Sequence, residues 1–192
     1  MKALPRNFYE RDPAAVAKGL LGKVLVRRLA DKVLSGKIVE TEAYYGKDDP
    51  ASKAYKGRKT FNEPMFCEAG RTFIYIVHGN WLLNIVAHPE GEVGAVLIRA
   101  LEPIQGIEIM KKNRKIEDIK ALTNGPGKLT KALAITKELN GVDITDQNSD
   151  LTITCSGGET FEICASHRIG VKLDLPQELR FYIKGNAFVS KS

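Results

Sequence analysis

The stretch GKIVETEAYYG, residues 36–46, places two carboxylates two positions apart in what otherwise has the composition of a β-strand. Thr, Val, Ile and Tyr are enriched in strands, whereas Glu is depleted there. A period of two puts Ile38, Glu40, Glu42 and Tyr44 on one face, with about 7 Å between the Cα atoms of the two acids. Paired carboxylates at this separation can activate water or hold a divalent metal ion.

A second stretch, EVGAVLIRALEP at residues 92–103, predicts a mostly buried strand that carries one positive charge. Arg99 shares a face with Leu97 and Leu101, where a charge needs a partner. A pair between Arg99 and one of the two acids could be purely structural, with the other acid facing solvent. If both groups touch a trapped water, the arginine keeps the acid ionised and the acid can accept the water's proton.

The patterns around these two strands predict one α+β domain over residues 1–192, built on a mainly antiparallel sheet. Asp12-Pro13 begins a helix over residues 13–21, and Gly79-Asn80 lies in the middle of a hairpin over residues 71–87. Residues 46–64 predict a long loop. Strands are further expected at 23–29, 36–45, 151–155, 160–164, 168–173 and 179–185, and helical spacing marks 102–114 and 128–139.

Composition limits the class of protein. The chain has 192 residues, 43% of them hydrophobic and 27% charged, as in ordinary globular proteins. It has no apolar run of the roughly 18 residues that a membrane span needs, and no signal-peptide core near its start. We therefore expect a protein that acts away from membranes, cytoplasmic in a prokaryote and nuclear in a eukaryote.

The charge balance favours a polyanionic partner. Lys and Arg total 29 against 23 Asp and Glu, a net charge of +6 with a pI near 9.2, which is typical of nucleic-acid-binding proteins. Three cysteines without CxxC spacing argue against a zinc site or a disulfide framework, although Cys155 and Cys164 could face each other across a hairpin.

Two further segments could contact phosphates. TNGPGKLTKAL, residues 123–133, lacks the spacing of a Walker A motif, but its Gly-rich turn could seat a DNA phosphate with the help of Lys128, or could simply begin a helix. Lys56 and Arg58 lie between Tyr55 and Phe61, and basic residues interleaved with aromatic rings suit nucleic acids.

Six motifs occur in order along the chain: IVETEAYYG, GRKTFNEPMF, FIYIVHGNWLLNIV, AVLIRALEP, NGPGKLTKALAI and LRFYIKGNAFVS. Together they resemble the alkyladenine (3-methyladenine) DNA glycosylases of the mammalian methylpurine type, over about residues 5–190. The resemblance implies a single mixed domain around a curved sheet with flanking helices, and a protruding β-hairpin that wedges into DNA. It also implies flipping of a damaged purine and hydrolysis of its glycosidic bond without metal or cofactor.

Carried over by motif, the resemblance assigns the catalytic residues. The general base falls on Glu42 and the water-binding arginine on Arg99, while the main-chain carbonyl of Ile169 would hold the same water. Glu42 adjoins Tyr44, so Glu40 is interpreted as a structural acid. We expect Glu42→Gln to abolish excision and Glu40→Gln mainly to weaken stability.

The same resemblance assigns the base pocket and the wedge. Tyr44 and Tyr75 would sandwich the flipped base, and Asn84 would exclude normal guanine by its bulk. The family's wedge is usually a tyrosine, but His78 stands there in this chain, and Trp81 is a second candidate for the task.

Lys53 stands where the family often has histidine. An ammonium group can only donate hydrogen bonds. A pocket Lys53 would repel the cationic bases 3-methyladenine and 7-methylguanine and would tolerate neutral hypoxanthine. If Lys53 turns outward to a phosphate instead, this shift in preference disappears.

The sequence therefore predicts a monofunctional purine DNA glycosylase that acts on double-stranded DNA with damaged purines, as a monomer. Two other classes stay open at this point. One is a non-catalytic DNA- or RNA-binding domain of the same fold, and the other is a metal-dependent nuclease that uses Glu40 and Glu42.

Overall fold

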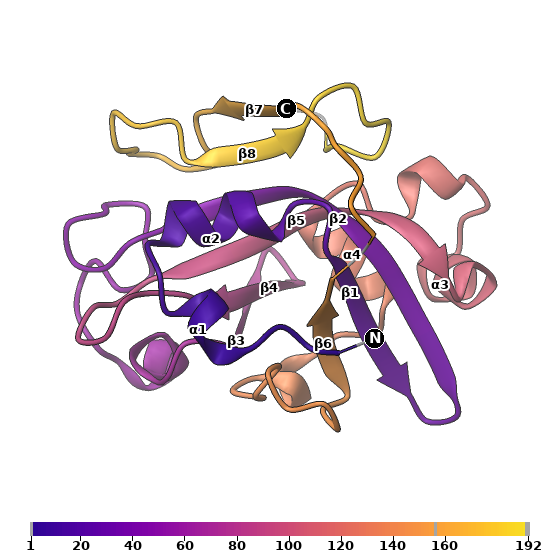
Figure 1. The fold of residues 1–192 in the computed structure, drawn as a ribbon, viewed down its shortest axis with the longest axis horizontal. Helices are drawn as coiled ribbons and strands as arrows, with labels where there is room; N and C mark the ends of the chain where they lie inside the picture. Colours follow the sequence, from indigo (N-terminus) through magenta and orange to yellow (C-terminus); the bar gives the residue numbers. More distant parts are fainter. Residues whose placement is uncertain (1, 156, 191–192) are drawn as a thin grey trace.

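The sheet is organised around one long strand, β2 (Lys32–Tyr44), in the computed structural model of the chain, which describes residues 2–155 and 157–190. The first half of β2 pairs with β1 (Val24–Leu29), and its second half pairs on the same edge with β8 (Arg180–Ile183). The opposite edge pairs with β5 (Ala95–Gln105) along most of its length. Figure 1 shows β2 and β5 running together through the molecule as curved ribbons.

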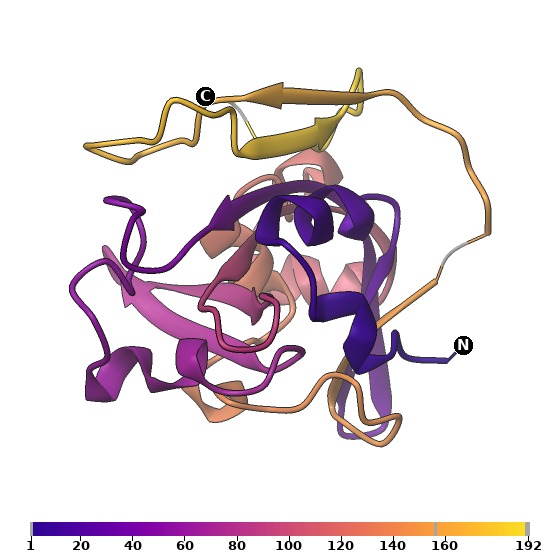
Figure 2. The same cartoon turned by 60° about the vertical axis from the view of Figure 1, so that its left-hand side comes forward.

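The other strands extend this centre into a curled sheet of eight antiparallel strands, in the order β3-β4-β5-β2-β1-β6 with β8 and β7 joined to β2. They are β3 (Thr72–Val77), β4 (Asn80–Val86), β6 (Leu151–Thr154) and β7 (Ile163–Ser166). Figure 2 shows β7 and β8 lying together along one edge of the molecule. The predicted α+β domain with a curved, mainly antiparallel sheet is confirmed.

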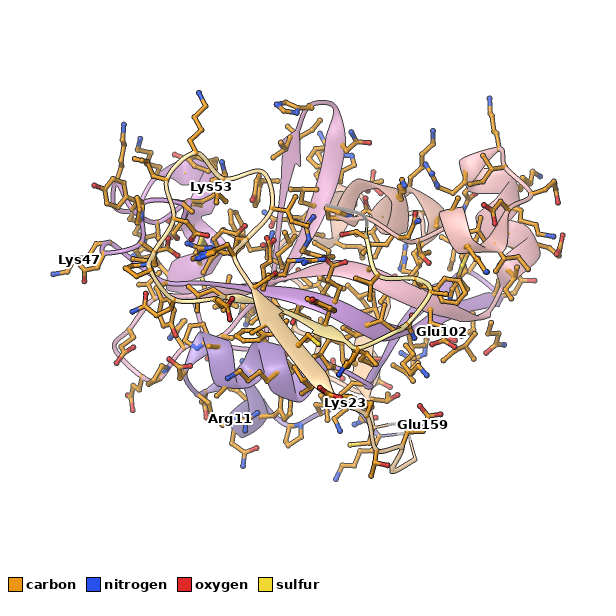
Figure 3. All side chains as sticks on the ribbon, turned by 90° about the horizontal axis from the view of Figure 1, so that it is seen from above. Arg11, Lys23, Lys47, Lys53, Glu102 and Glu159 are labelled. Atoms are coloured by element: carbon orange, nitrogen blue, oxygen red, sulfur yellow. The ribbon has the colours of Figure 1, made fainter. Side chains whose placement is uncertain are left out.

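Helices cover both sides of this sheet. The α-helices are α1 (Arg6–Tyr9), α2 (Pro13–Leu20), α3 (Ile107–Arg114) and α4 (Pro126–Ala132), and the 3₁₀ helices are η1 (Thr60–Phe66), η2 (Ile119–Ala121) and η3 (Lys137–Leu139). Figure 3 shows α2 on one side of the sheet and the pair of α3 and α4 on the other. No helix in the described part of the chain is both long enough and apolar enough to cross a membrane.

Helix α2 begins where the sequence predicts. The Asp12 carboxylate accepts a hydrogen bond from the Ala15 N–H at 3.0 Å, and Pro13 occupies the first helical position. The helix buries Val16, Ala17 and Leu20 against β2 and β5, within the main core of aliphatic side chains. A smaller cluster under the loop at residues 46–59 consists of Ala54, Met65, Phe73, Val86 and Ala95.

The hairpin of β3 and β4 is also confirmed. Its turn residues, His78 and Gly79, both have positive φ, at 46° and 77°, which matches the right-handed twist of the flanking strands. The tip extends beyond the rest of the ribbon in Figure 3. Ile76 near the tip is 55% exposed, so the hairpin presents apolar surface to solvent.

Three strand predictions need correction. The connection between the first two strands is shorter than expected, because Ala30 adopts a positive φ of 52° and β2 already begins at Lys32. Residues 168–173 form a loop, not a strand. Cys155 and Cys164 do not face each other across a hairpin, because β6 pairs with β1 whereas β7 pairs with β8.

Both later helices are shorter than their apolar spacing predicts. Residues 102–105 belong to β5, and α3 begins only after Gly106. Helix α4 ends at Ala132, where Ala134 takes φ 51° and the Ile135 N–H donates to the Thr130 carbonyl at 2.8 Å. This is the hydrogen bond of a Schellman motif, which usually has Gly at the left-handed position. With Ala there, the sequence carries no stop signal.

Candidate active site

Two irregularities in the pairing of β2 with β5 place Arg99 in the site. Glu40 lies opposite Ala100 and Thr41 lies opposite Ile98, so Arg99 falls in a bulge between these pairs. Bulges of this kind redirect a side chain from a strand. The Arg99 guanidinium is buried and contacts both acids of β2, with Nε 3.1 Å from Glu40 and Nη1 3.1 Å from Glu42.

The alternative in which one of the two acids faces solvent is wrong. Glu40 and Glu42 are both 0% exposed. Glu40 Oε1 accepts hydrogen bonds from Arg99, from Arg180 Nε at 2.7 Å and from Ser190 Oγ at 2.8 Å, while Oε2 accepts from the Ser190 N–H at 2.7 Å. These donors surround Glu40 and tie β2 to β5, to β8 and to the C-terminal segment.

Glu42 has fewer partners and a different environment. Its Oε1 accepts from the Ile169 N–H at 2.8 Å and lies against Arg99, and its Oε2 accepts from the Tyr44 hydroxyl at 2.7 Å. Burial raises the pKa of the Glu42 carboxyl above its ordinary value, although Arg99, the Ile169 N–H and the Tyr44 hydroxyl act in the opposite direction. Glu42 is therefore a carboxylate with a strengthened affinity for protons.

Tyr44 contributes both its hydroxyl and its ring. Burial and the nearby Glu42 carboxylate hold the pKa of Tyr44 well above its usual range, so the hydroxyl stays protonated and donates to Glu42. The Arg168 guanidinium lies over the ring, 4.5 Å from its centroid.

A cleft of about 780 Å³ borders Tyr44, Arg99 and Ile169, whereas Glu42 lies beneath these residues and is not part of its lining. Its walls bring together the hairpin tip, the loop at residues 50–56, the loop at 169–173 and the beginning of α4. Seven sequence-predicted site residues line it: Tyr44, Lys53, Lys56, Tyr75, His78, Arg99 and Ile169. Lys53 lies on the side of the sheet from which the hairpin projects, whereas Arg11 and Lys23 lie on the other side (Figure 3).

A small cavity adjoins the cleft between the two predicted aromatic walls. Tyr44, Tyr75, Lys53 and Asn84 line it, so the fold brings these four predicted residues together around a space of only about 10 Å³. Lys53 Nζ lies 5.1 Å from the centroid of the Tyr75 ring. Asn84 is buried, and its amide nitrogen donates to the Phe73 carbonyl at 3.1 Å.

Three predicted DNA-binding residues lie outside the cleft lining. Trp81 is half-buried and packs against the main core. Arg58 is paired with the Glu63 carboxylate. Lys128 donates to Asn124 at 2.8 Å, beside the cleft residues Pro126 and Gly127.

The beginning of α4 packs closely on the hairpin, because a Cβ at Gly127 would lie 2.7 Å from that of Asn80.

A second hollow, of about 850 Å³, lies behind the loop at residues 46–57 and is lined by Tyr45, Phe66, Leu175 and neighbouring residues. It contains none of the sequence-predicted site residues.

Sequence reasoning missed the groups that hold these walls in place. Arg168 is fully buried between Asp49 and Asp174, and Arg180 with Ser190 holds Glu40. An arginine in an apolar context is the signal that identified Arg99. The same signal was present in RIGV, residues 168–171, but Asp49 lies 119 positions away and no local pattern links the two.

The metal-site alternative has little geometric support. Within residues 2–155 and 157–190, no three His, Cys, Asp or Glu side chains gather in a way that could hold a metal ion. Glu40 and Glu42 are oriented toward arginines and hydrogen-bond donors.

Known proteins match this chain over nearly its full length. Residues 7–187 match the methylpurine-DNA glycosylase family. A protein of Carboxydothermus hydrogenoformans is 44% identical over 191 residues, covering 98% of both chains. Proteins of Koribacter versatilis and Aeropyrum pernix are 41% and 40% identical, covering 97% and 100% of this chain and 92% and 94% of their own. All three are named "Putative 3-methyladenine DNA glycosylase".

Proposed function

The chain belongs to the methylpurine-DNA glycosylase family and is a DNA glycosylase, a hydrolase of N-glycosyl bonds, and from this premise we propose that it removes damaged purines with a water molecule activated by Glu42. DNA is its substrate partner. The proposed substrates are duplexes that carry 3-methyladenine, 7-methylguanine or hypoxanthine.

The observation that carries this proposal is the arrangement of donors around Glu42. A carboxylate offers about four acceptor positions. Ile169 and Arg99 use two of them at Oε1, and Tyr44 uses one at Oε2. The remaining position, on Oε2, can accept a hydrogen bond from water, and the raised pKa makes Glu42 a better proton acceptor than an exposed glutamate.

The proposed reaction is direct hydrolysis. Water attacks the anomeric carbon of the sugar, the bond from that carbon to the purine nitrogen breaks, and the purine takes the bonding electrons. Glu42 accepts a proton from the water, and Arg99 keeps Glu42 ionised before the attack. Positive charge develops on the sugar as in other glycosyl transfers, and the adjacent carboxylate favours it.

Access to that carbon requires the nucleotide to leave the base stack. We assign Tyr44 and Tyr75 as the walls that hold the flipped base, with Asn84 limiting its size from the adjoining cavity. His78 at the exposed hairpin tip is assigned to fill the gap in the duplex. The packing of Trp81 on the core favours His78 for this role.

The phosphate contacts are assigned to basic side chains near the cleft. Lys56 lines it, Lys128 lies at its edge beside the beginning of α4, and Arg58 would have to leave Glu63 to reach DNA. One chain supplies every proposed site residue, so we propose a monomer.

Lys53 determines the proposed lesion preference. Its ammonium group lies against the face of Tyr75 and lines the small cavity. In that position it disfavours a cationic alkylated base and can donate a hydrogen bond to a neutral one. We therefore propose that hypoxanthine is preferred over 7-methylguanine.

The test uses duplexes that carry a single hypoxanthine or alkylpurine, in the presence of EDTA. After incubation, alkali-labile sites are measured for the wild type and for Glu42→Gln. Excision by the wild type that disappears in Glu42→Gln supports the proposed function. Excision that survives in Glu42→Gln, or strand cleavage that needs added metal, would overturn it.

A further inference from the structure

Arg168 has more buried polar contacts than any group that the proposed reaction uses directly. Its side chain is 0% exposed and lies between two aspartates. Nη1 and Nη2 donate to the two oxygens of Asp49 at 2.6 and 2.8 Å, and Nε and Nη2 donate to Asp174 Oδ1 at 2.9 and 2.5 Å. Nη1 also donates to the Ala43 carbonyl at 3.0 Å.

These bonds join three segments that are distant in the sequence. Ala43 belongs to the catalytic strand β2, and Asp49 belongs to the loop that carries Lys53. Asp49 in turn accepts from the N–H groups of Tyr45 and Ala51, at 3.0 Å each. Asp174 belongs to the C-terminal loop, whose ribbon passes beside Lys53 in Figure 3 and lines the same cleft.

The consequence for the site lies in the residue that follows. The main chain of Arg168 leads directly to Ile169, whose N–H donates to Glu42 Oε1 at 2.8 Å. The Arg168 N–H donates to Asp174 Oδ2 at 3.2 Å, so both the side chain and the backbone of this residue are fixed. The guanidinium also faces the ring of Tyr44, whose hydroxyl donates to the other oxygen of Glu42.

We propose that Arg168, clamped between Asp49 and Asp174, is a positioning residue that sets the orientation of Glu42 through the Ile169 N–H and the Tyr44 ring. The inference rests on the proposed function, because it concerns the same carboxylate. It adds that the C-terminal loop and the loop at residues 46–55 form one rigid unit with the general base, and that loosening the clamp changes the chemistry before it changes DNA binding.

The expected signature is a change in the titration of Glu42. The ionisable groups around Glu42 are Arg99 from β5, Glu40 and Tyr44 from β2, and Tyr75 from β3. The Ile169 N–H favours the ionised form of Glu42, so losing it raises the pKa of that carboxyl further. The acid limb of the excision rate then moves to higher pH.

The chain offers a closely matched pair of variants. Asp174 accepts from Arg168 at 2.5 Å and from the Leu175 N–H, and its side chain is 18% exposed. Asp143 accepts from Arg6 at 2.5 Å and from the Thr145 N–H, and its side chain is 28% exposed. Asp143 contacts no site residue, so Asp143→Asn controls for the general loss of a half-buried ion pair.

The experiment measures single-turnover excision of hypoxanthine from a duplex as a function of pH, together with duplex binding and thermal unfolding. For Asp174→Asn we expect the acid limb to move up by about one pH unit and the rate below the limb to fall about tenfold, with binding little changed. Arg168→Lys, which keeps the charge but loses the planar fork, should shift the limb in the same direction. If Arg168→Lys does not fold, Asp174→Asn alone decides.

Two results separate this inference from the proposed function. A wild-type pH profile for Asp174→Asn, with a stability loss equal to that of Asp143→Asn, would overturn the positioning role while Glu42→Gln remains inactive. Full excision by Glu42→Gln would overturn the proposed function itself, and the positioning role with it.

Discussion

Replacing Glu40 with glutamine should weaken the fold while the folded protein keeps most of its excision activity. Glu40 is fully buried and accepts from Arg99, Arg180 and both donors of Ser190. A glutamine amide has one acceptor oxygen, so its NH₂ group must point at a donor that Glu40 now satisfies. The two arginines also lose the anion that they share.

The size of the effect follows from these contacts. Breaking a buried ion pair by removing one partner costs about 3–5 kcal/mol. Gln preserves the shape and one acceptor, so we expect the lower end, about 3 kcal/mol. In a chain of 192 residues this corresponds to a melting temperature lower by about 10 °C.

Glu42→Gln is the matched comparison, because it makes the same chemical change two residues away on the same strand. Burial raises the pKa of Glu42, so its ionised form does not stabilise the fold at neutral pH. Glu42→Gln should therefore melt close to the wild type and yet lack excision.

Denaturant unfolding and single-turnover excision per folded molecule, measured on both variants, check this asymmetry. A Glu40→Gln protein that is as stable as the wild type but inactive would refute the reasoning, as would a Glu42→Gln protein that is strongly destabilised and active.

Three further predictions concern the cleft. Excision should rise with pH along an acid limb centred above about 4.3, the pKa of free glutamate, because Glu42 must be ionised and burial raises its pKa. Protonated Glu42 stabilises the fold relative to the ionised form, so this contribution to the free energy of unfolding is lost as pH rises through the raised pKa. Lys53→His should increase the ratio of 7-methylguanine to hypoxanthine excision, and an unchanged ratio would remove Lys53 from the specificity argument. His78→Ala should reduce flipping, measured by the fluorescence of 2-aminopurine beside the lesion, without lowering stability; Trp81→Ala should instead cost about 2 kcal/mol of stability because its indole packs on the core.

Local chemistry explains which features the sequence could predict. Asp12-Pro13 carries its own helix start, and Gly79-Asn80 marks the β3–β4 hairpin, although the turn residues are His78 and Gly79 and Asn80 already begins β4. Arg99 was also identifiable, as a charge among aliphatic residues, whereas the choice of Glu42 over Glu40 as the base came from the family resemblance. Helix α4 was predicted too long because an alanine, Ala134, occupies the left-handed position that glycine usually marks.

The groups that hold the site together could not be predicted in this way. Ser190 meets Glu40 across 150 positions, and Arg168 meets Asp49 across 119. Such contacts depend on how β8 and the C-terminal loop return to β2, and no periodicity or turn signal encodes that pairing. The burial of Glu40 has the same origin, because its contacts come from Arg180 of β8 and from Ser190 of the C-terminal segment.

The return of the C-terminal segment gives the two acids of β2 different properties. Glu40 receives two arginines and both donors of Ser190, so its acceptor positions are used by groups that depend on its charge. Glu42 shares one arginine and receives a hydroxyl and a single N–H. The two glutamates therefore differ in what their charge does. The fold depends on the negative charge of Glu40, whereas it does not depend on that of Glu42. A carboxylate of the second kind can accept a proton without loss of structure, which is the property that a general base needs.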